Sequence, residues 1–382
     1  MILPEYLNLV DKRLEQITSS FITGRFWNRG WTWVDSVSMK GWTYQETGRF
    51  FAALPFTKET WKRVSVILGE SEVEYWGKAN VNPYQVDSDL ELAIDKLLQY
   101  GRPYAAIDCI DKIFHEGKSL KETQATSALI AAITSSEPSY LLNNHNIIEV
   151  IRALQDSDET DPDQLFRVEW AYLPLLDGYS GASPKLLSNR LATDSSFFCE
   201  VIRLVYRSDR GLLLDAELTD QEKAMATNAY RLLKEWKIPP GMRKGNGFSG
   251  EDFIAWLQEV KTTCNSSGHF DVALSQIGEV LVYCPPDPSG LWINQNVAEA
   301  LNAKDAEKMR RGFCIELFNS RGAHWVDPTG QPERDLAEKY RQQAEDVENA
   351  GYQRLAASLR GVADSYDRDA ERIIAEQDQV DD

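Results

Sequence analysis

Apolar residues recur along most of the chain at the three- and four-residue spacing of one α-helical face. The clearest example covers residues 89–114, where two such segments are separated by Gly101-Arg102-Pro103. The apolar positions of the two segments are Leu90, Ile94, Leu97 and Leu98, then Ala106, Ile110, Ile113 and Phe114. Gly101 suits the left-handed end of a helix, and Pro103 suits the first turn of the next. The pattern predicts a helical hairpin that buries its two apolar faces.

The same periodicity predicts further helices before and after this hairpin. They cover residues 1–22, 57–76, 120–134, 144–154, 165–176, 195–207 and 219–236. We therefore expect an all-α protein of roughly fifteen helices, given typical helix lengths. Proline and glycine interrupt the pattern at 238–250, which predicts an N-terminal helical array over 1–238 and a C-terminal helical region over 251–382.

The end of the chain shows a heptad-like series of apolar residues. Its members are Tyr352, Leu355, Leu359, Val362, Tyr366 and Ile373. Because Asp369 interrupts the series, it is too short for a free coiled coil. We expect this helix to fold back on the preceding segment, near Leu336 and Tyr340, as a C-terminal helical hairpin.

Residues 23–56 differ in character, because tryptophan alternates there with glycine and arginine. The residues concerned are Trp27, Trp31, Trp33 and Trp42, Gly24, Gly30, Gly41 and Gly48, and Arg25, Arg29 and Arg49. One interpretation is a glycine-punctuated loop that the aromatic side chains fasten to the first helices. The other is a surface on which single-stranded nucleic acid stacks its bases. The acidic flanks favour the loop, because they weaken phosphate binding.

Three stretches share one spacing, in which alanine follows glycine by five residues. The pairs are Gly101 and Ala106, Gly268 and Ala273, and Gly351 and Ala356. In this respect the chain resembles tetratricopeptide-type repeats, whose second helix carries a small residue at that offset. The likeness covers about a quarter of the chain and follows no fixed 34-residue period. It implies an irregular, tetratricopeptide-like or HEAT-like α-solenoid.

Two other stretches, 168–176 and 317–325, resemble parts of the C-terminal helical region of long, uncharacterised bacterial proteins. This likeness implies no reaction. It implies a bacterial scaffold that works with separate effector domains, in a multi-component system such as defence against phage.

Composition and charge narrow the class of protein. The chain has 382 residues, 43% of them hydrophobic, which is ample for a packed core. Its formal net charge of −18 argues against bulk binding of nucleic acid. The five cysteines are scattered and odd in number, so they indicate reduced thiols and not a disulfide framework. With no signal peptide and no long apolar run, we expect a cytoplasmic protein that does not associate with membranes.

Candidate chemistry is sparse. Cys264, His269, Cys284, Cys314 and His324 are the residue types that bind zinc, but they lack the two close ligand pairs of a structural zinc site. Glu169 lies on an apolar stripe, so it is either a recognition or acid–base residue, or one half of an internal ion pair with Arg152 or Arg203. We favour the ion pair, and we expect neither metal nor cofactor.

The function that these patterns favour is a non-enzymatic scaffold for protein–protein interaction. Glu200, Arg203 and Arg207 share a polar stripe that we expect to line a groove for a protein partner. Trp31 and Trp33 are expected to be exposed anchors, since tryptophan and arginine dominate interface energetics. The alternative is a nucleic-acid-associated effector that uses the segment 25–49. Oligomeric state does not follow from the sequence.

Overall fold

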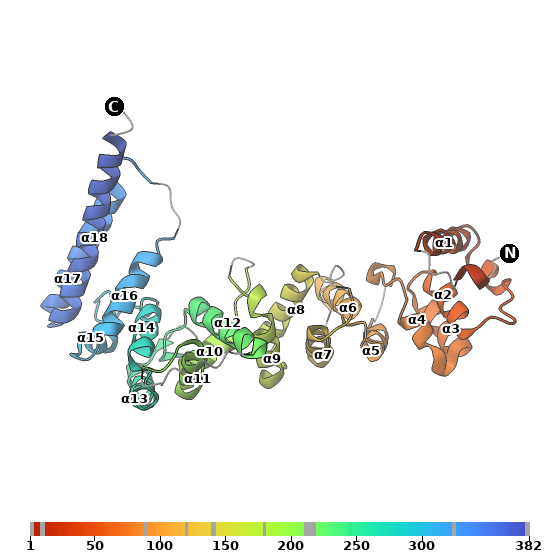
Figure 1. Cartoon of the computed structure of the whole chain (residues 1–382), viewed down its shortest axis with the longest axis horizontal. Helices are drawn as coiled ribbons and strands as arrows, with labels where there is room; N and C mark the ends of the chain where they lie inside the picture. Colours follow the sequence, from red (N-terminus) through yellow and green to blue (C-terminus); the bar gives the residue numbers. More distant parts are fainter. Residues whose placement is uncertain are drawn as a thin grey trace. The chain divides into compact units, whose positions relative to one another are not determined.

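The computed structural model describes residues 4–7, 12–86, 90–118, 121–138, 143–178, 181–209, 219–243, 245, 247–322 and 326–378. Helices make up nearly all the regular structure of these residues, so the all-α prediction is confirmed for them (Figure 1). Their one sheet is a two-residue antiparallel pair. None of the described helices combines the length and apolar character needed to cross a membrane.

The chain divides into two compact units, residues 1–182 and 183–382. The helices of the first unit are η1 (Pro4–Leu7), α1 (Lys12–Asp35), α2 (Tyr44–Ala52), α3 (Lys58–Leu68), η2 (Gly69–Ser71), α4 (Val73–Trp76), η3 (Pro83–Gln85), α5 (Glu91–Gln99), α6 (Pro103–His115), α7 (Glu122–Ile133), α8 (Asn144–Asp156), α9 (Pro162–Tyr172) and η5 (Leu173–Leu175).

The tryptophan- and glycine-rich segment is more helical than the sequence predicted. The predicted opening helix over 1–22 begins at Lys12 and continues as α1 to Asp35, and α2 follows within the same segment. An interior glycine costs a helix only about 1 kcal/mol, so Gly24 does not end α1. Gly30 does disturb it, with a φ of 59° and a ψ of −155° that mark a kink. The loop expectation for 23–56 is corrected accordingly.

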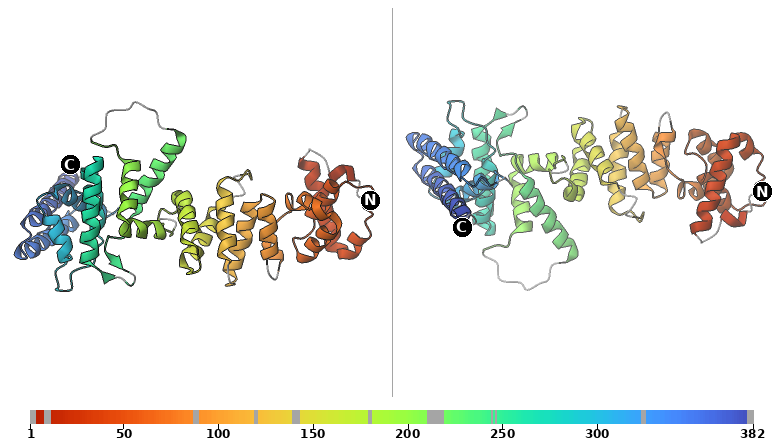
Figure 2. Two further views of the ribbon diagram at one scale, coloured as in Figure 1. Left: turned by 90° about the horizontal axis from the view of Figure 1, so that it is seen from below. Right: turned by 90° about the horizontal axis from the view of Figure 1, so that it is seen from above.

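The predicted central hairpin is confirmed as α5 and α6, joined at Gly101 with a φ of 73°. Helices α5 to α9 follow one another in a regular order of contacts: α5, α6 and α7 each touch the two helices that follow them. Figures 1 and 2 show them as a row of short helices, coloured orange to yellow-green. Their buried faces carry small and branched residues, such as Ala128, Leu129 and Ile151.

The second unit contains the remaining helices and the short strand pair. These elements are α10 (Lys185–Thr193), α11 (Ser195–Val205), α12 (Asp220–Glu235), β1 (Met242–Arg243), β2 (Gly247–Phe248), α13 (Gly250–Ser267), α14 (Phe270–Leu281), α15 (Gln295–Asn302), α16 (Glu307–Asn319), α17 (Gln331–Asn349) and α18 (Gln353–Asp378).

The boundary predicted near Pro239 falls inside this second unit, because aromatic packing joins the elements on either side of it. Trp236 follows α12 and Trp256 lies in α13, and their ring centroids are 6.3 Å apart. Phe198 of α11 contacts both, at 5.4 and 5.1 Å. Between α12 and α13 the chain forms the β1–β2 hairpin, so the proline- and glycine-rich stretch is a turn within one core.

Helices α14 and α16 approach each other unusually closely, at two glycines. A Cβ atom added to Gly278 would lie 2.0 Å from the carbonyl oxygen of Met309, and one added to Gly312 would lie 2.0 Å from that of Ser275. Backbone therefore faces backbone at this crossing, which only glycine permits. The contact sets the position of α16 relative to α14.

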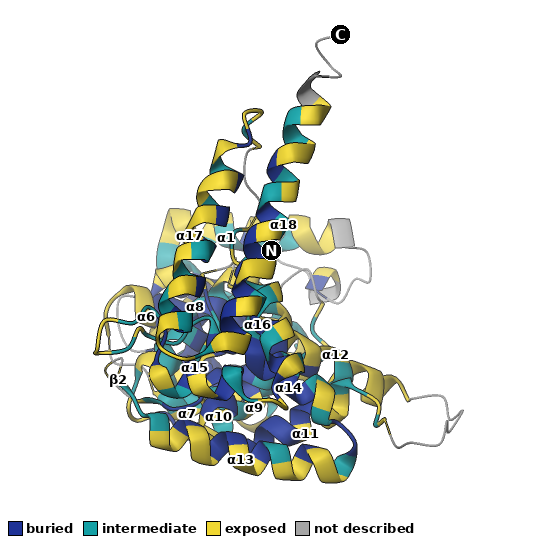
Figure 3. Cartoon of the chain, turned by 90° about the vertical axis from the view of Figure 1, so that its left-hand side faces the viewer, coloured by how far each residue is buried: buried dark blue, intermediate teal, exposed yellow. Residues whose placement is uncertain are grey.

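The last two helices form the expected C-terminal hairpin. Helices α17 and α18 lie side by side in Figures 1 and 2, and Figure 3 shows buried and exposed residues alternating along both. Tyr340 of α17 stacks on Tyr366 of α18 with centroids 5.6 Å apart. Leu355 and Leu359, from the heptad-like series, are fully buried. The prediction that this seam folds back on the preceding helix is confirmed.

The three glycine–alanine pairs occupy equivalent positions in three helix–helix turns, α5–α6, α13–α14 and α17–α18. Gly101, Gly268 and Gly351 all have positive φ angles, of 73°, 74° and 96°. In each turn the residue after glycine donates its N–H to the carbonyl five positions back, at 2.8 Å. This pattern is the Schellman motif. The three alanines of these pairs are at most 1% exposed.

Candidate functional site

The structure places both expected tryptophan anchors half-buried, and not exposed as the sequence suggested. The Trp31 ring lies 5.0 Å from Phe26 and 4.3 Å beneath the guanidinium carbon of Arg63. Trp33 packs at 6.0 Å from Phe50. Their contacts are thus within their own unit, and their use by a partner remains a prediction. Trp27 is instead the exposed tryptophan of this segment, at 68%.

The nucleic-acid alternative depends on the same segment. Arg25 lies over the ring of Phe21, 5.3 Å from its centroid, and Trp42 packs against Phe50 at 5.6 Å. Of the four tryptophans, Trp27 is the one whose ring is largely open to a base. A run of stacking platforms is therefore not formed by the described residues, and the alternative stays a prediction.

The predicted polar stripe on α11 is divided by the end of the helix. Glu200 and Arg203 are exposed on α11, but the helix ends at Val205, two residues before Arg207. Tyr206 adopts an extended conformation, with a φ of −112° and a ψ of 146°. Arg207 is exposed as expected, yet it does not continue the helical stripe. The groove predicted here stays a prediction.

Hydrogen bonds to the α13–α14 turn explain why α11 ends early. Ser208 Oγ donates to the carbonyl of Ser267 at 2.8 Å, and Asp209 donates its N–H to that of Gly268 at 2.8 Å. His269 Nε2 lies 3.1 Å from the carbonyl oxygen of Tyr206. The segment after α11 is fastened to the turn, and the buried His269 is one of its structural contacts.

The cysteines show thiol packing. Cys199 and Cys264 face each other on α11 and α13 with sulfur atoms 3.5 Å apart. The hydrogen bond that Cys199 shares with Cys264, together with burial, raises the pKa of Cys199. Among the described residues no three His, Cys, Asp or Glu side chains gather where they could hold a metal ion. His324 lies outside the described residues.

Glu169 is fully buried in α9. It accepts a hydrogen bond from Gln155 Nε2 at 2.6 Å. Arg152, one of the two ion-pair partners expected for it, forms an ion pair with Glu149. A buried carboxylate needs polar partners, and Gln155 is one of them. Whether Glu169 has a recognition role remains a prediction.

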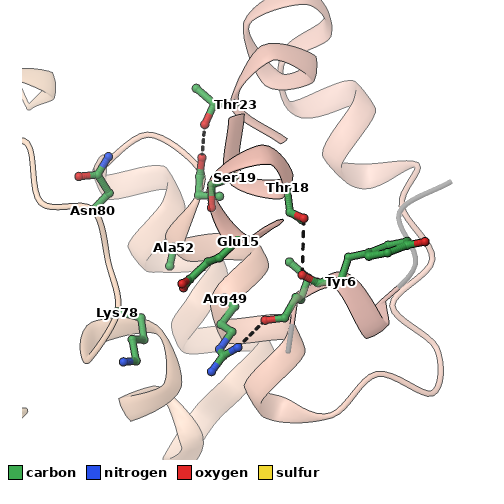
Figure 4. Close-up of a pocket in the computed structure, with 11 residues that line it drawn as sticks. Tyr6, Glu15, Thr18, Ser19, Thr23, Arg49, Ala52, Lys78 and Asn80 are labelled. Carbon is green, nitrogen blue, oxygen red and sulfur yellow. Dashed lines mark hydrogen bonds between the residues drawn. The ribbon is translucent and has the colours of Figure 1, made fainter. Parts of the chain in front are cut away.

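A polar pocket of about 230 Å³ opens among η1, α1, α2 and the segment after α4 (Figure 4). Glu15 and Arg49 lie within it, with Lys78 and Asn80 on the side away from η1. Arg49 donates to the carbonyl of Leu7 at 2.6 Å, and Thr23 donates to that of Ala53 at 2.8 Å. The pocket is smaller than typical ligand sites of about 300–1,000 Å³, and its polar groups largely hold its own walls.

A second concave surface runs between α16 and α18, and the sequence did not predict it. Two adjoining cavities of about 380 Å³ each share Arg311, Cys314 and Ser358, so they form one groove. We call it the α16–α18 groove. Its α16 side consists of Glu307, Arg310, Arg311, Cys314, Ile315, Phe318 and Asn319. Its α18 side consists of Arg354, Ala357, Ser358, Gly361, Val362 and Ser365.

Both walls follow the spacing of a single helical face. Counted from its first member, the α18 wall lies at i, i+3, i+4, i+7, i+8 and i+11, and six of the α16 residues repeat the same series. Glu307 and Arg354 begin the two series at the same end of the groove, so the N-terminal ends of both helices meet there. Cys314 Sγ joins the walls midway, 3.8 Å from the carbonyl oxygen of Ser358.

The two ends of the groove differ in chemistry. Arg310, Arg311 and Arg354 gather at one end, and Ile315 and Phe318 line the other. Burial and the nearby charge of Arg354 lower the pKa of Arg310. The hydroxyl groups of the α18 wall donate within their own helix, Ser358 to the carbonyl of Arg354 and Ser365 to that of Gly361. The middle of the groove therefore offers little free hydrogen-bonding capacity.

No family model, no curated protein and no solved structure matches the chain. The resemblances to tetratricopeptide repeats and to long bacterial proteins are therefore neither supported nor opposed by a relative.

Proposed function

We propose that the chain is a non-enzymatic protein–protein interaction scaffold of helical-repeat type. The ordered contacts of α5 to α9 support the repeat-type part of this proposal, because helices that pack chiefly on their near neighbours stack as repeats do. The three equivalent Schellman turns support it as well. As in other helical-repeat proteins, the faces not used for stacking would serve for docking.

The observation that carries the binding role is an exposed apolar row on α1. Leu14, Ile17 and Phe21 are 39%, 64% and 43% exposed and lie on one face, at i, i+3 and i+7. Ile22, the residue after Phe21 and therefore about 100° further round α1, is fully buried. Apolar side chains that gather on one exposed helix face mark interaction sites far more often than single exposed residues do.

The row ends in a positive charge, which indicates the chemistry of its partner. Arg25 lies over the ring of Phe21 and forms no ion pair with a described residue. An apolar helix of another protein that carries a carboxylate at one end would complement the row. We propose that such a helix docks on α1.

A capture experiment with a single substituted position tests this role. The tagged full chain, wild type or Ile17→Glu, is immobilised and exposed to nuclease-treated extract of the source organism, and bound proteins are quantified by mass spectrometry. We expect at least one bound protein to fall by about tenfold or more with Ile17→Glu, because a buried charge opposes docking.

Tyr84→Glu is the matched control, since Tyr84 is 72% exposed in the same unit and lies outside the row. It should retain the captured protein. Equal capture by wild type and Ile17→Glu, with circular dichroism showing both folded, contradicts the proposal. Capture that occurs only in a parallel extract without nuclease treatment supports the nucleic-acid alternative instead.

A further inference from the structure

The α16–α18 groove has the form that a helical peptide needs. Two helix faces line it over three turns each, at matching spacing, so a third helix could lie between them as in a helical bundle. Its α18 wall is built largely of small residues, Ala357, Ser358 and Gly361, which allow close approach. A Cβ atom added at Gly361 would find no atom within 4 Å, so the space beside it is empty.

The positive charge at one end of the groove favours an acidic ligand. Arg310, Arg311 and Arg354 gather there in a chain whose formal net charge is −18. Throughout the described ranges, no carboxylate forms an ion pair with any of these three residues. Glu307 also lines this end, without an ion-pair contact to them. The N-terminal ends of α16 and α18 add two positive dipole ends at the same place.

Only part of each guanidinium group is used within the chain. Arg310 donates from Nη1 to the carbonyls of Leu301 and Ala303, at 2.7 and 2.8 Å, which fixes its position. Arg354 donates from Nη1 to the carbonyl of Asn302 at 3.4 Å. Arg311 is exposed, and its side chain makes no hydrogen bond with a described residue. Donors remain available for carboxylates of a bound segment, to which arginine binds bidentately.

The other end selects apolar side chains. Ile315 is 41% exposed, and Val362 and Phe318 form the surface beside it. One face of the Phe318 ring is already covered by Tyr366, with ring centroids 4.3 Å apart. Phe318 is thus poorly placed as a stacking platform for nucleic-acid bases, and a protein segment fits this end better than a single strand.

We propose that the α16–α18 groove binds an acidic amphipathic helix of a partner protein, with its carboxylates at Arg311 and Arg354 and its apolar side chains on Ile315 and Phe318. This site lies in the second unit, whereas the proposed α1 row lies in the first, so each proposal stands or fails separately. Two such surfaces would let one chain hold two partners, as a scaffold does.

The test selects ligands without assuming their sequence. A phage-displayed library of helical 16-residue peptides is selected on the full chain and counter-selected on the variant Gly361→Trp, whose new side chain would fill the groove. We expect the enriched peptides to carry two or more Asp or Glu residues toward one end and apolar residues at i, i+3 or i+4 spacing along the rest.

Affinities of synthetic winners then measure the charge contribution by fluorescence anisotropy. We expect Arg311→Glu to weaken binding by about tenfold or more, and rising salt to weaken it further, since paired charges at a rim are screened. Gly361→Ala is the matched control for Gly361→Trp, because a single methyl group fits the empty space; it should bind within about twofold of wild type. Thermal melting confirms that each variant is folded.

Several outcomes overturn the inference. Enrichment of peptides without acidic residues removes the role of the arginines. Winners that bind Gly361→Trp as well as wild type bind elsewhere, and a selection that yields no groove-dependent peptide removes the site. Competition by a 20-nucleotide single strand at equal concentration would assign the arginines to nucleic acid instead.

Discussion

At the scale of single residues, burial changes what a side chain can do more than its chemical type does. Cys314 lies in the α16–α18 groove with its thiol directed at a backbone carbonyl. Burial raises the pKa of Cys314 to about 11, and the neighbouring Arg310 only partly opposes this change. Because the thiolate is the reactive form, the raised pKa makes Cys314 a weaker nucleophile at neutral pH than a free cysteine.

We therefore expect alkylation of Cys314 to be slow at pH 7 and to accelerate up to about pH 11. The sign follows from the raised pKa: protonation persists to higher pH than in a free cysteine, whose pKa is about 8.5. Iodoacetamide labelling, read peptide by peptide in the mass spectrometer, measures the profile. A half-maximal rate near pH 8.5 would contradict the burial argument.

The exposure of the tryptophan side chains could not be predicted from the sequence. Trp31 and Trp33 have the residue type of interface anchors, but their exposure depends on Phe26, Arg63 and Phe50, which reach them only in the folded unit. No local pattern separates them from the exposed Trp27. Residue type was readable from the sequence, and accessibility was not.

At the scale of helices, two glycines of the second unit have opposite surroundings. Gly278 lies where α14 meets the backbone of α16, with no room for a methyl group. Gly361 lies on the open side of α18, with no atom within 4 Å of an added Cβ. Replacing glycine by alanine should therefore change the free energy of unfolding in opposite directions at the two positions, so each serves as the control for the other.

We expect Gly278→Ala to lower the free energy of unfolding by about 2 kcal/mol or more, because the new methyl group must push α14 and α16 apart. Gly361→Ala should raise it by about 0.5–1 kcal/mol, the usual gain for an exposed helical position. Urea unfolding of both variants beside wild type measures the difference. A stabilising Gly278→Ala would mean that the two helices are not in backbone contact.

Local signals explain which elements could be predicted. The α5–α6 hairpin was readable because Gly101 and Pro103 specify its turn within three residues. The course of α1 through Gly24 and the end of α11 at Val205 were not. At the end of α11 the deciding hydrogen bonds are accepted by the carbonyls of Ser267 and Gly268, about 60 residues away, which no local pattern contains.

At the scale of the whole molecule, the chain consists of two units that each enclose their own core. The sequence predicted a division near Pro239, where proline and glycine cluster. Such residues mark a turn as readily as a linker, and here the Trp236–Trp256 contact crosses them. The α16–α18 groove was missed for a related reason: the two helices that form it are separated by α17 in the sequence.

Two units with separate cores should unfold separately. In differential scanning calorimetry we expect Gly278→Ala to lower one transition by roughly 4–8 °C, as a loss of about 2 kcal/mol does for a unit of this size. Gly48→Ala, where a Cβ would lie 2.6 Å from Glu74 of α4, should lower the other. A single transition that both substitutions move would show that the units unfold together.

The glycine contact between α14 and α16 has a consequence for how the groove could change its width. Because the two backbones are in contact there, α16 is held rigidly against α14, whereas α18 packs chiefly on α17. Bound helices of different diameter would then be accommodated by a tilt of α17 and α18 together, away from α16. Spin labels placed on α18 and on α14 would register that tilt as a change in their separation, while labels on α16 and α14 would not.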